Sequence, residues 1–118
     1  MIIKILEEMK RLRLESSFKN YRDLGNILRE DIKQEILFQQ LEFNNMTLEK
    51  INTLGILDLI VNTIKLLENE ITCNNNLLED KLYKEDYATF KIMSQANNDL
   101  KFSLNRLNAV LCDIKYNH

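Results

Sequence analysis

The sequence FKIMSQANNDLKFSLNRLNAVLCDI occupies residues 90–114 and carries the most regular hydrophobic pattern of the chain. Its apolar residues recur at alternating steps of three and four, which is the heptad spacing of a helix that packs along a second helix. The repeat predicts a long C-terminal helix with an interaction seam along its full length. The a and d positions of this seam are held by Phe90, Met93, Asn97, Leu100, Leu104, Leu107, Leu111 and Ile114.

The residues that flank the seam are mostly small and uncharged. A free two-stranded coiled coil usually carries charged side chains at its e and g positions. Small flanking residues instead favour close packing against neighbouring helices within a bundle. The g positions here are Ala96, Ser103 and Val110, and the e positions are Ser94, Lys101 and Asn108.

Asn97 is the polar residue within the seam, and it has two interpretations. A polar a position lowers stability but can specify register and oligomeric state, here that of a homodimer. Alternatively, Asn97 hydrogen-bonds to a neighbouring helix of the same chain or to water. The sequence leaves both interpretations open.

Two further amphipathic patterns lie in the first third of the chain, and both predict helices. One face of the first segment contains Ile2, Ile5, Leu6, Met9 and Leu12. A second stripe contains Leu14, Phe18, Tyr21, Leu28, Ile32 and Ile36. Gly25 interrupts this second stripe, so the helix either ends after Leu24 or continues through the glycine as a kinked or closely packed helix.

Turn signals divide the middle of the chain. Asn44, Asn45 and Thr47 can each cap a helix, which predicts a boundary near residues 44–47. Residues 48–71 are apolar around much of the helical circumference, which is typical of a central helix. Asparagines at 74–76 predict a turn. A short apolar helix should follow it, with Leu77, Leu78, Leu82 and Tyr83.

The composition favours helices throughout. The 118-residue chain has no proline and only two glycines, so the strongest helix breakers are almost missing. Its hydrophobic content of 45% can supply one core, and no linker rich in Ser, Gly or Pro divides it. The sequence therefore predicts an all-α, single-domain helical bundle over residues 1–118, with about four to five helices including the long heptad-patterned one.

Histidine and glycine, on which many catalytic and phosphate-binding sites depend, are scarce. The single histidine is His118, at a terminal position where a pre-organised site is hard to maintain. Histidine-dependent triads and Glu-x-x-His metal sites are therefore not expected. Gly25 and Gly55 lie outside any glycine-rich phosphate-binding motif. The sequence predicts a non-enzymatic protein without a metal or cofactor.

The cysteines and the hydropathy indicate the compartment. Cys73 and Cys112 have neither the number nor the spacing of a disulfide framework or a metal site, so we expect buried, reduced thiols. The first residues do not form the apolar core of a secretory signal, and no stretch has the length of a membrane span. We therefore expect a cytoplasmic protein. The 15 Asn and 13 Ile suggest an AT-rich genome, such as that of a low-GC bacterium, a phage or a virus.

The charge distribution restricts the partners. The net charge of -2 argues against sequence-independent binding to nucleic acid or anionic lipid, which requires a basic face. We therefore expect a protein-binding module that acts as an adaptor, an inhibitor or a modulator of host or defence functions. An export chaperone or immunity protein is an alternative. A small DNA-binding transcriptional regulator is a third possibility, and it would need a basic recognition helix.

Overall fold

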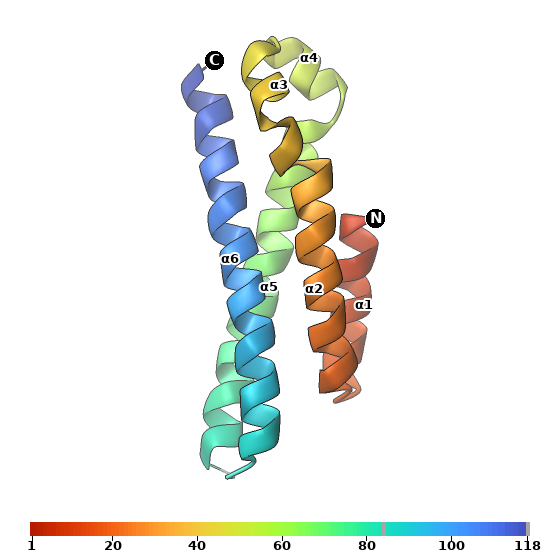
Figure 1. The fold of residues 1–118 in the computed structure, drawn as a ribbon, viewed down its shortest axis with the longest axis vertical. Coiled ribbons are helices and arrows are strands. Elements are labelled where there is room, and N and C mark those ends of the chain that lie inside the picture. Colours follow the sequence, from red (N-terminus) through yellow and green to blue (C-terminus); the bar gives the residue numbers. More distant parts are fainter. Residues whose placement is uncertain (84, 118) are drawn as a thin grey trace.

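Long helices make up most of the molecule. A computed structural model describes residues 1–83 and 85–117 and is 90% helical, with no strand in that part of the chain (Figure 1). Two short helices and a 3-10 turn connect α2 to α5 at one end of the molecule: η1 (Leu37–Gln39), α3 (Gln40–Asn45) and α4 (Leu48–Thr53). The long helices are α1 (Ile2–Leu14), α2 (Phe18–Glu35), α5 (Ile56–Tyr83) and α6 (Tyr87–Asn117). The all-α class and the long C-terminal helix are confirmed.

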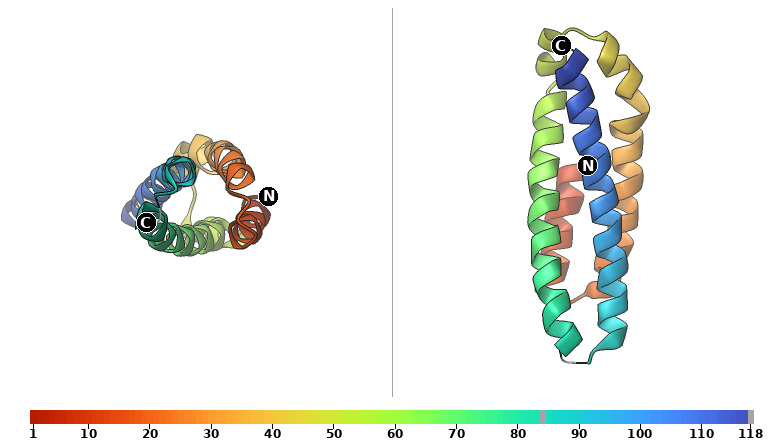
Figure 2. Two further views of the ribbon diagram at one scale, coloured as in Figure 1. Left: turned by 90° about the horizontal axis from the view of Figure 1, so that it is seen from below. Right: turned by 90° about the vertical axis from the view of Figure 1, so that its left-hand side faces the viewer.

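The long helices form a four-membered ring in the order α1, α2, α6, α5. Figure 2 shows this ring from one end, with α2 diagonally opposite α5. The direct contacts agree, since α6 packs on both α5 and α2, α2 also packs on α1, and α1 meets α5 more sparsely. In Figure 1, α1 and α5 run in one direction, and α2 and α6 run in the other. The connection through η1, α3 and α4 therefore crosses the end of the bundle diagonally.

The predicted apolar faces form the core. Ile2, Ile5, Leu6, Met9 and Leu12 of α1 are all buried, as the spacing predicts. On α2 the second stripe turns inward from Tyr21 onward. Leu14 does not belong to that stripe, because it ends α1 and its side chain is exposed. The remaining buried members of the stripe are Leu28, Ile32 and Ile36.

Gly25 lies in the interior of α2, which continues through it without ending. The residue is buried against α1, and a Cβ atom built on it would lie 3.5 Å from Cε of Met9. That distance is an ordinary van der Waals contact. Of the two predicted outcomes, the structure therefore has the continuous, closely packed helix.

The helix boundary near residue 47 is confirmed, but the next predicted helix is divided. Thr47 caps α4 by accepting a hydrogen bond from the backbone N–H of Lys50 at 3.2 Å. A continuous helix over 48–71 is wrong, because α4 ends at Thr53 and α5 begins at Ile56. Gly55 between them has φ of +72°, a left-handed conformation that glycine adopts without steric cost and that ends a helix.

The predicted turn at residues 74–76 is also wrong, since α5 runs through it to Tyr83. Asn74 is fully buried, and its side chain bonds to other helices rather than to its own backbone. Asparagine favours turns chiefly through such local bonds, so its tertiary partners remove that preference. The separate short helix after residue 76 therefore does not exist.

The cysteines are free, as the sequence predicts, but they are not both buried. Cys73 is half-buried on α5, and Cys112 is exposed on α6. Cys112 occupies the b position of the heptad, which lies on the side of α6 opposite its packed face.

Candidate functional site

The predicted seam of α6 lies mostly inside the bundle of the same chain. Asn97 is 1% exposed, and four apolar seam residues have no exposed surface. The other three seam residues are partly exposed along the edge of this face. The fully buried apolar residues are Met93, Leu100, Leu107 and Ile114, and the partly exposed ones are Phe90, Leu104 and Leu111.

The packed face of α6 is wider than the seam and shifted toward the small flank. The g residues Ala96, Ser103 and Val110 are buried, whereas Lys101 and Asn108 at e positions are exposed. A helix that contacts both α2 and α5 needs a wide face, and small residues let the neighbouring backbones approach. The small residues therefore mark the side of α6 that meets the bundle.

Asn97 bonds to α5 within the chain. Its Nδ2 donates to Oδ1 of Asn75 at 2.9 Å, and its Oδ1 accepts from Nδ2 of Asn74 at 3.3 Å. Both side-chain groups of Asn97 thus have partners on the adjacent helix. These bonds match the second interpretation of Asn97, in which it hydrogen-bonds to a neighbouring helix of the same chain.

The bonds of Asn97 continue into a buried polar network that joins the four long helices. Nδ2 of Asn74 also donates to the Tyr21 hydroxyl at 2.9 Å, and that hydroxyl donates to Oε2 of Glu70 at 2.9 Å. Arg13 closes the network with a bidentate contact, from Nε to Oε2 of Glu70 at 2.9 Å and from Nη2 to Oε1 at 3.2 Å. The network thus links α1, α2, α5 and α6.

Burial changes the acid–base properties of this network. Burial raises the pKa of the Tyr21 hydroxyl well above its ordinary value, and the nearby Glu70 carboxylate raises it further. The hydrogen bonds to Glu70 raise the pKa of the Arg13 guanidinium. At neutral pH Tyr21 therefore stays protonated and Arg13 stays charged.

Sequence reasoning missed this network, although a signal for it was present. Glu70 and Asn74 follow Leu67 on α5 at steps of three and four, so they continue its apolar stripe with polar residues. Polar side chains on the buried stripe of a helix require partners inside the protein. The identity of those partners could not be read from the sequence, because they come from three other helices.

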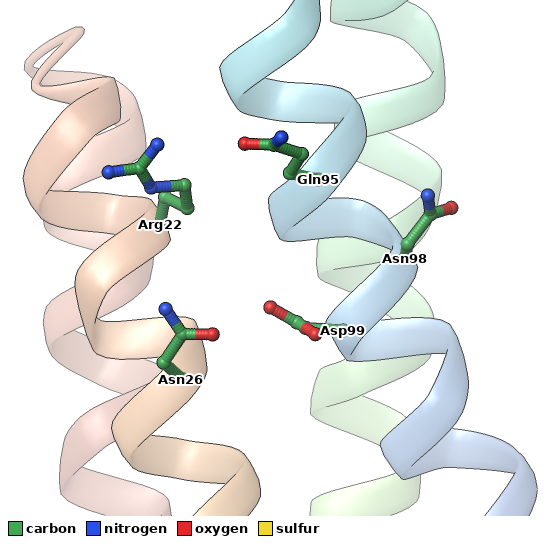
Figure 3. Close-up of a pocket in the computed structure, with 5 residues that line it drawn as sticks. All are labelled: Arg22, Asn26, Gln95, Asn98 and Asp99. Carbon is green, nitrogen blue, oxygen red and sulfur yellow. The ribbon is translucent and has the colours of Figure 1, made fainter.

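A polar cleft lies on the outer side of the bundle between α2 and α6 (Figure 3). It encloses about 450 Å³. In the figure, Arg22 of α2 and Gln95 of α6 extend toward one another, and Asp99 extends toward α2. The carboxylate of Asp99 accepts a hydrogen bond from Nη1 of Arg29 at 3.1 Å. The residues that line the cleft are Arg22, Asn26, Gln95, Asn98 and Asp99.

A second groove follows the sparse contact between α1 and α5. It encloses about 550 Å³, with Leu6 and Leu66 among its lining residues and the Arg13–Glu70 ion pair along it. The half-buried thiol of Cys73 also reaches this groove. The ion pair is already satisfied by the bundle itself, so Arg13 and Glu70 are not available to an external ligand.

One end of the molecule exposes several large apolar side chains. Phe38 of η1 and Leu41 of α3 are 68% and 78% exposed, and Leu54, just after α4, is 57% exposed. Leu48 at the start of α4 is partly exposed as well, at 40%. All four lie on the diagonal connection between α2 and α5, at the end where η1, α3 and α4 are drawn in Figure 1. We call these four residues the apolar end.

Among the described residues, no group of three His, Cys, Asp or Glu residues is placed to hold a metal ion. No helix among the described residues is long and apolar enough to cross a membrane. His118 lies outside the described residues. No protein-family model, curated protein or solved structure matches this chain.

Proposed function

We propose that this chain is a non-enzymatic protein-binding bundle, an adaptor or inhibitor that acts on a host or defence protein and uses the apolar end to hold it. The observation that carries this proposal is the exposure of Phe38, Leu41, Leu48 and Leu54 on one connecting segment. We place its action in the cytoplasm, where unpaired cysteines such as Cys73 and Cys112 stay reduced.

The apolar end is not required by the packing of its own segment. The same connection already supplies Phe43 and Ile51 to the core, with 2% and 0% exposure. Asp113 of α6 accepts a hydrogen bond from Gln40, which ties the segment to the bundle. The four exposed residues therefore add apolar surface beyond what anchors the connection, and large apolar side chains exposed on one segment make it a candidate interaction site.

The energy available at the apolar end suits protein binding. Burying a large apolar side chain against a partner is worth about 1.5–3 kcal/mol when it was fully exposed before. A few such anchors usually dominate the affinity of a protein interface. A partner segment with two or three apolar or aromatic side chains would therefore gain enough energy to bind at this end.

The test uses peptides selected from a random display library on the immobilised wild-type protein. We expect the selected peptides to carry apolar or aromatic anchors and to lose at least tenfold in affinity when Leu41→Lys or Phe38→Ser replaces the wild type. Ile27→Ser is the matched control, because Ile27 is an exposed apolar residue on α2, outside the connection. Equal binding to Leu41→Lys and the wild type would refute the apolar end as the binding surface.

A further inference from the structure

Basic side chains gather on α2 along the polar cleft. Arg22, Asn26, Arg29 and Lys33 follow one another at steps of four, three and four, so they share one face of the helix. This face is turned toward α6, because Arg29 bonds to Asp99 there and Arg22 and Asn26 line the cleft. We call Arg22, Arg29 and Lys33 the basic stripe.

Two exposed aromatic rings accompany the basic stripe. The guanidinium carbon of Arg29 lies 4.2 Å from the ring centroid of Phe102, and Nζ of Lys33 lies 5.5 Å from that of Phe38. Such cation–π contacts orient the cations without neutralising them. Both rings also keep exposed surface. The stripe therefore presents positive charge next to apolar ring surface.

The cations differ in how far their charge is already compensated. Arg29 has a carboxylate partner in Asp99 at 3.1 Å. Arg22 has an ion-pair contact with its chain neighbour Asp23, at 3.5 Å. Since a charged hydrogen bond is normally 2.7–2.9 Å long, this contact is weak. Arg22 and Lys33 are therefore more available than Arg29 to form an ion pair with an external anion.

We propose that the polar cleft and basic stripe bind an extended acidic segment of a partner protein. The Arg22 guanidinium pairs with one carboxylate of the segment, and the Lys33 ammonium pairs with another. Asn26 and Gln95 between them offer amide donors and acceptors to the backbone of the segment. The Phe102 ring contacts its aliphatic side-chain carbons. This inference rests on the proposed protein-binding function and adds a second surface to it.

The spacing of the cations specifies the segment. Lys33 lies eleven positions after Arg22 on α2, which corresponds to about 16 Å along the helix axis. An extended chain rises about 3.3 Å per residue, so about five residues span this distance. The preferred segment therefore has acidic residues about five positions apart, with uncharged residues between them.

The carboxylate of Asp99 favours a peptide over a nucleic acid. Asp99 lines the cleft and already pairs with Arg29, which lies between Arg22 and Lys33 on α2, so this middle position offers no free cation to a further anion. A nucleic acid strand carries a phosphate at every nucleotide and cannot leave this position uncharged. A peptide can, because only its acidic side chains are charged. The preference for a peptide over a nucleic acid also agrees with the net charge of -2 of the protein.

The test is fluorescence polarisation with two labelled synthetic peptides of equal composition. One has two glutamates five positions apart in a serine- and leucine-containing chain, and the other has them adjacent. We expect the spaced peptide to bind at least threefold more tightly, with affinity that falls as NaCl is added. Arg22→Gln and Lys33→Gln should each weaken its binding about threefold to fivefold, the range of a single exposed charge pair.

Lys65→Gln is the control, because it removes the same charge from α5, which is diagonally opposite α2. Equal weakening by Lys65→Gln, no preference between the two peptides, or no binding of either peptide would each overturn the proposal. Tighter binding of a dT12 oligonucleotide that depends on Arg22 would also overturn it, in favour of a nucleic-acid surface. Leu41→Ser, which removes apolar surface without adding charge, should leave peptide binding unchanged, so a failure of the apolar end is distinguishable from a failure of this site.

Discussion

The ion pair between Arg13 and Glu70 should dominate the response of the bundle to mutation. Glu70 is 5% exposed, and its carboxylate is held by two hydrogen bonds from Arg13 and one from Tyr21. Arg13→Met keeps most of the aliphatic length of the side chain but removes the charge and both bonds. It leaves a buried carboxylate with the Tyr21 hydroxyl as its remaining partner from this network.

The expected loss follows from the cost of an unpaired buried charge. Breaking a buried ion pair from one side typically costs about 3–5 kcal/mol. The Arg13 side chain is 15% exposed, so in the variant water can partly replace its hydrogen bonds to Glu70. We therefore expect the free energy of unfolding to fall by about 3 kcal/mol. For a chain of this size that corresponds to a fall in Tm of roughly 10 °C.

The assay is urea unfolding at pH 7 followed by circular dichroism at 222 nm, with m-values compared between variants. Adding Glu70→Gln to Arg13→Met should recover at least half of the loss, because a neutral amide costs less to bury than an unpaired carboxylate and can still accept from Tyr21. Lys10→Met is the control. It removes an exposed charge from the same helix and should stay within about 0.5 kcal/mol of the wild type. A loss below about 1 kcal/mol for Arg13→Met, or no recovery in the double variant, would refute this account of the network.

Three further predictions concern single side chains of the core. Burial raises the pKa of Tyr21, so above pH about 10 the unfolded chain releases a proton that the folded chain keeps, and stability should fall by about 1.4 kcal/mol per pH unit. The Tyr21→Phe variant has no hydroxyl that titrates at this position. The difference between its free energy of unfolding in urea and that of the wild type should therefore shrink between pH 9 and about pH 11. A constant difference would contradict the raised pKa of Tyr21. Asn97→Leu should lower stability by about 1–3 kcal/mol, because it removes the partner of Asn75 and one partner of Asn74, and the mass from light scattering should not change. A more stable variant with a new mass would instead support the oligomer-specifying interpretation. Gly25→Ala should raise stability by up to about 1 kcal/mol, since alanine favours the helix and its Cβ makes an ordinary contact with Met9, and a lower Tm would show that the contact cannot be accommodated.

The faces of the helices could be predicted from the sequence because amphipathicity is a local property. A residue three or four positions from another lies on the same side of a helix whatever the rest of the chain does. The buried face of α1 and the packed side of α6 both followed from spacing alone. So did the small residues such as Ala96 that face the bundle. The cap at Thr47 was equally local, since donor and acceptor are three residues apart.

The breaks between helices were harder to predict, because local preference competes with tertiary partners. Gly55 ends a helix where the apolar pattern is continuous, by adopting a left-handed conformation that the pattern does not encode. Asn74 shows the opposite case. Its turn preference is overcome because Tyr21 and Asn97 supply hydrogen bonds inside the bundle.

The sequence by itself determined that this chain is helical and which residues face inward, because both depend on neighbours within one or two turns. Only the tertiary structure decided that α2 lies beside α6 and diagonally opposite α5. That order brings Arg13 to Glu70 across 57 residues of sequence and sets the basic face of α2 against Asp99. Such pairings depend on which helices become neighbours, and the apolar stripes that hold a bundle together do not specify that choice, since hydrophobic packing has no direction.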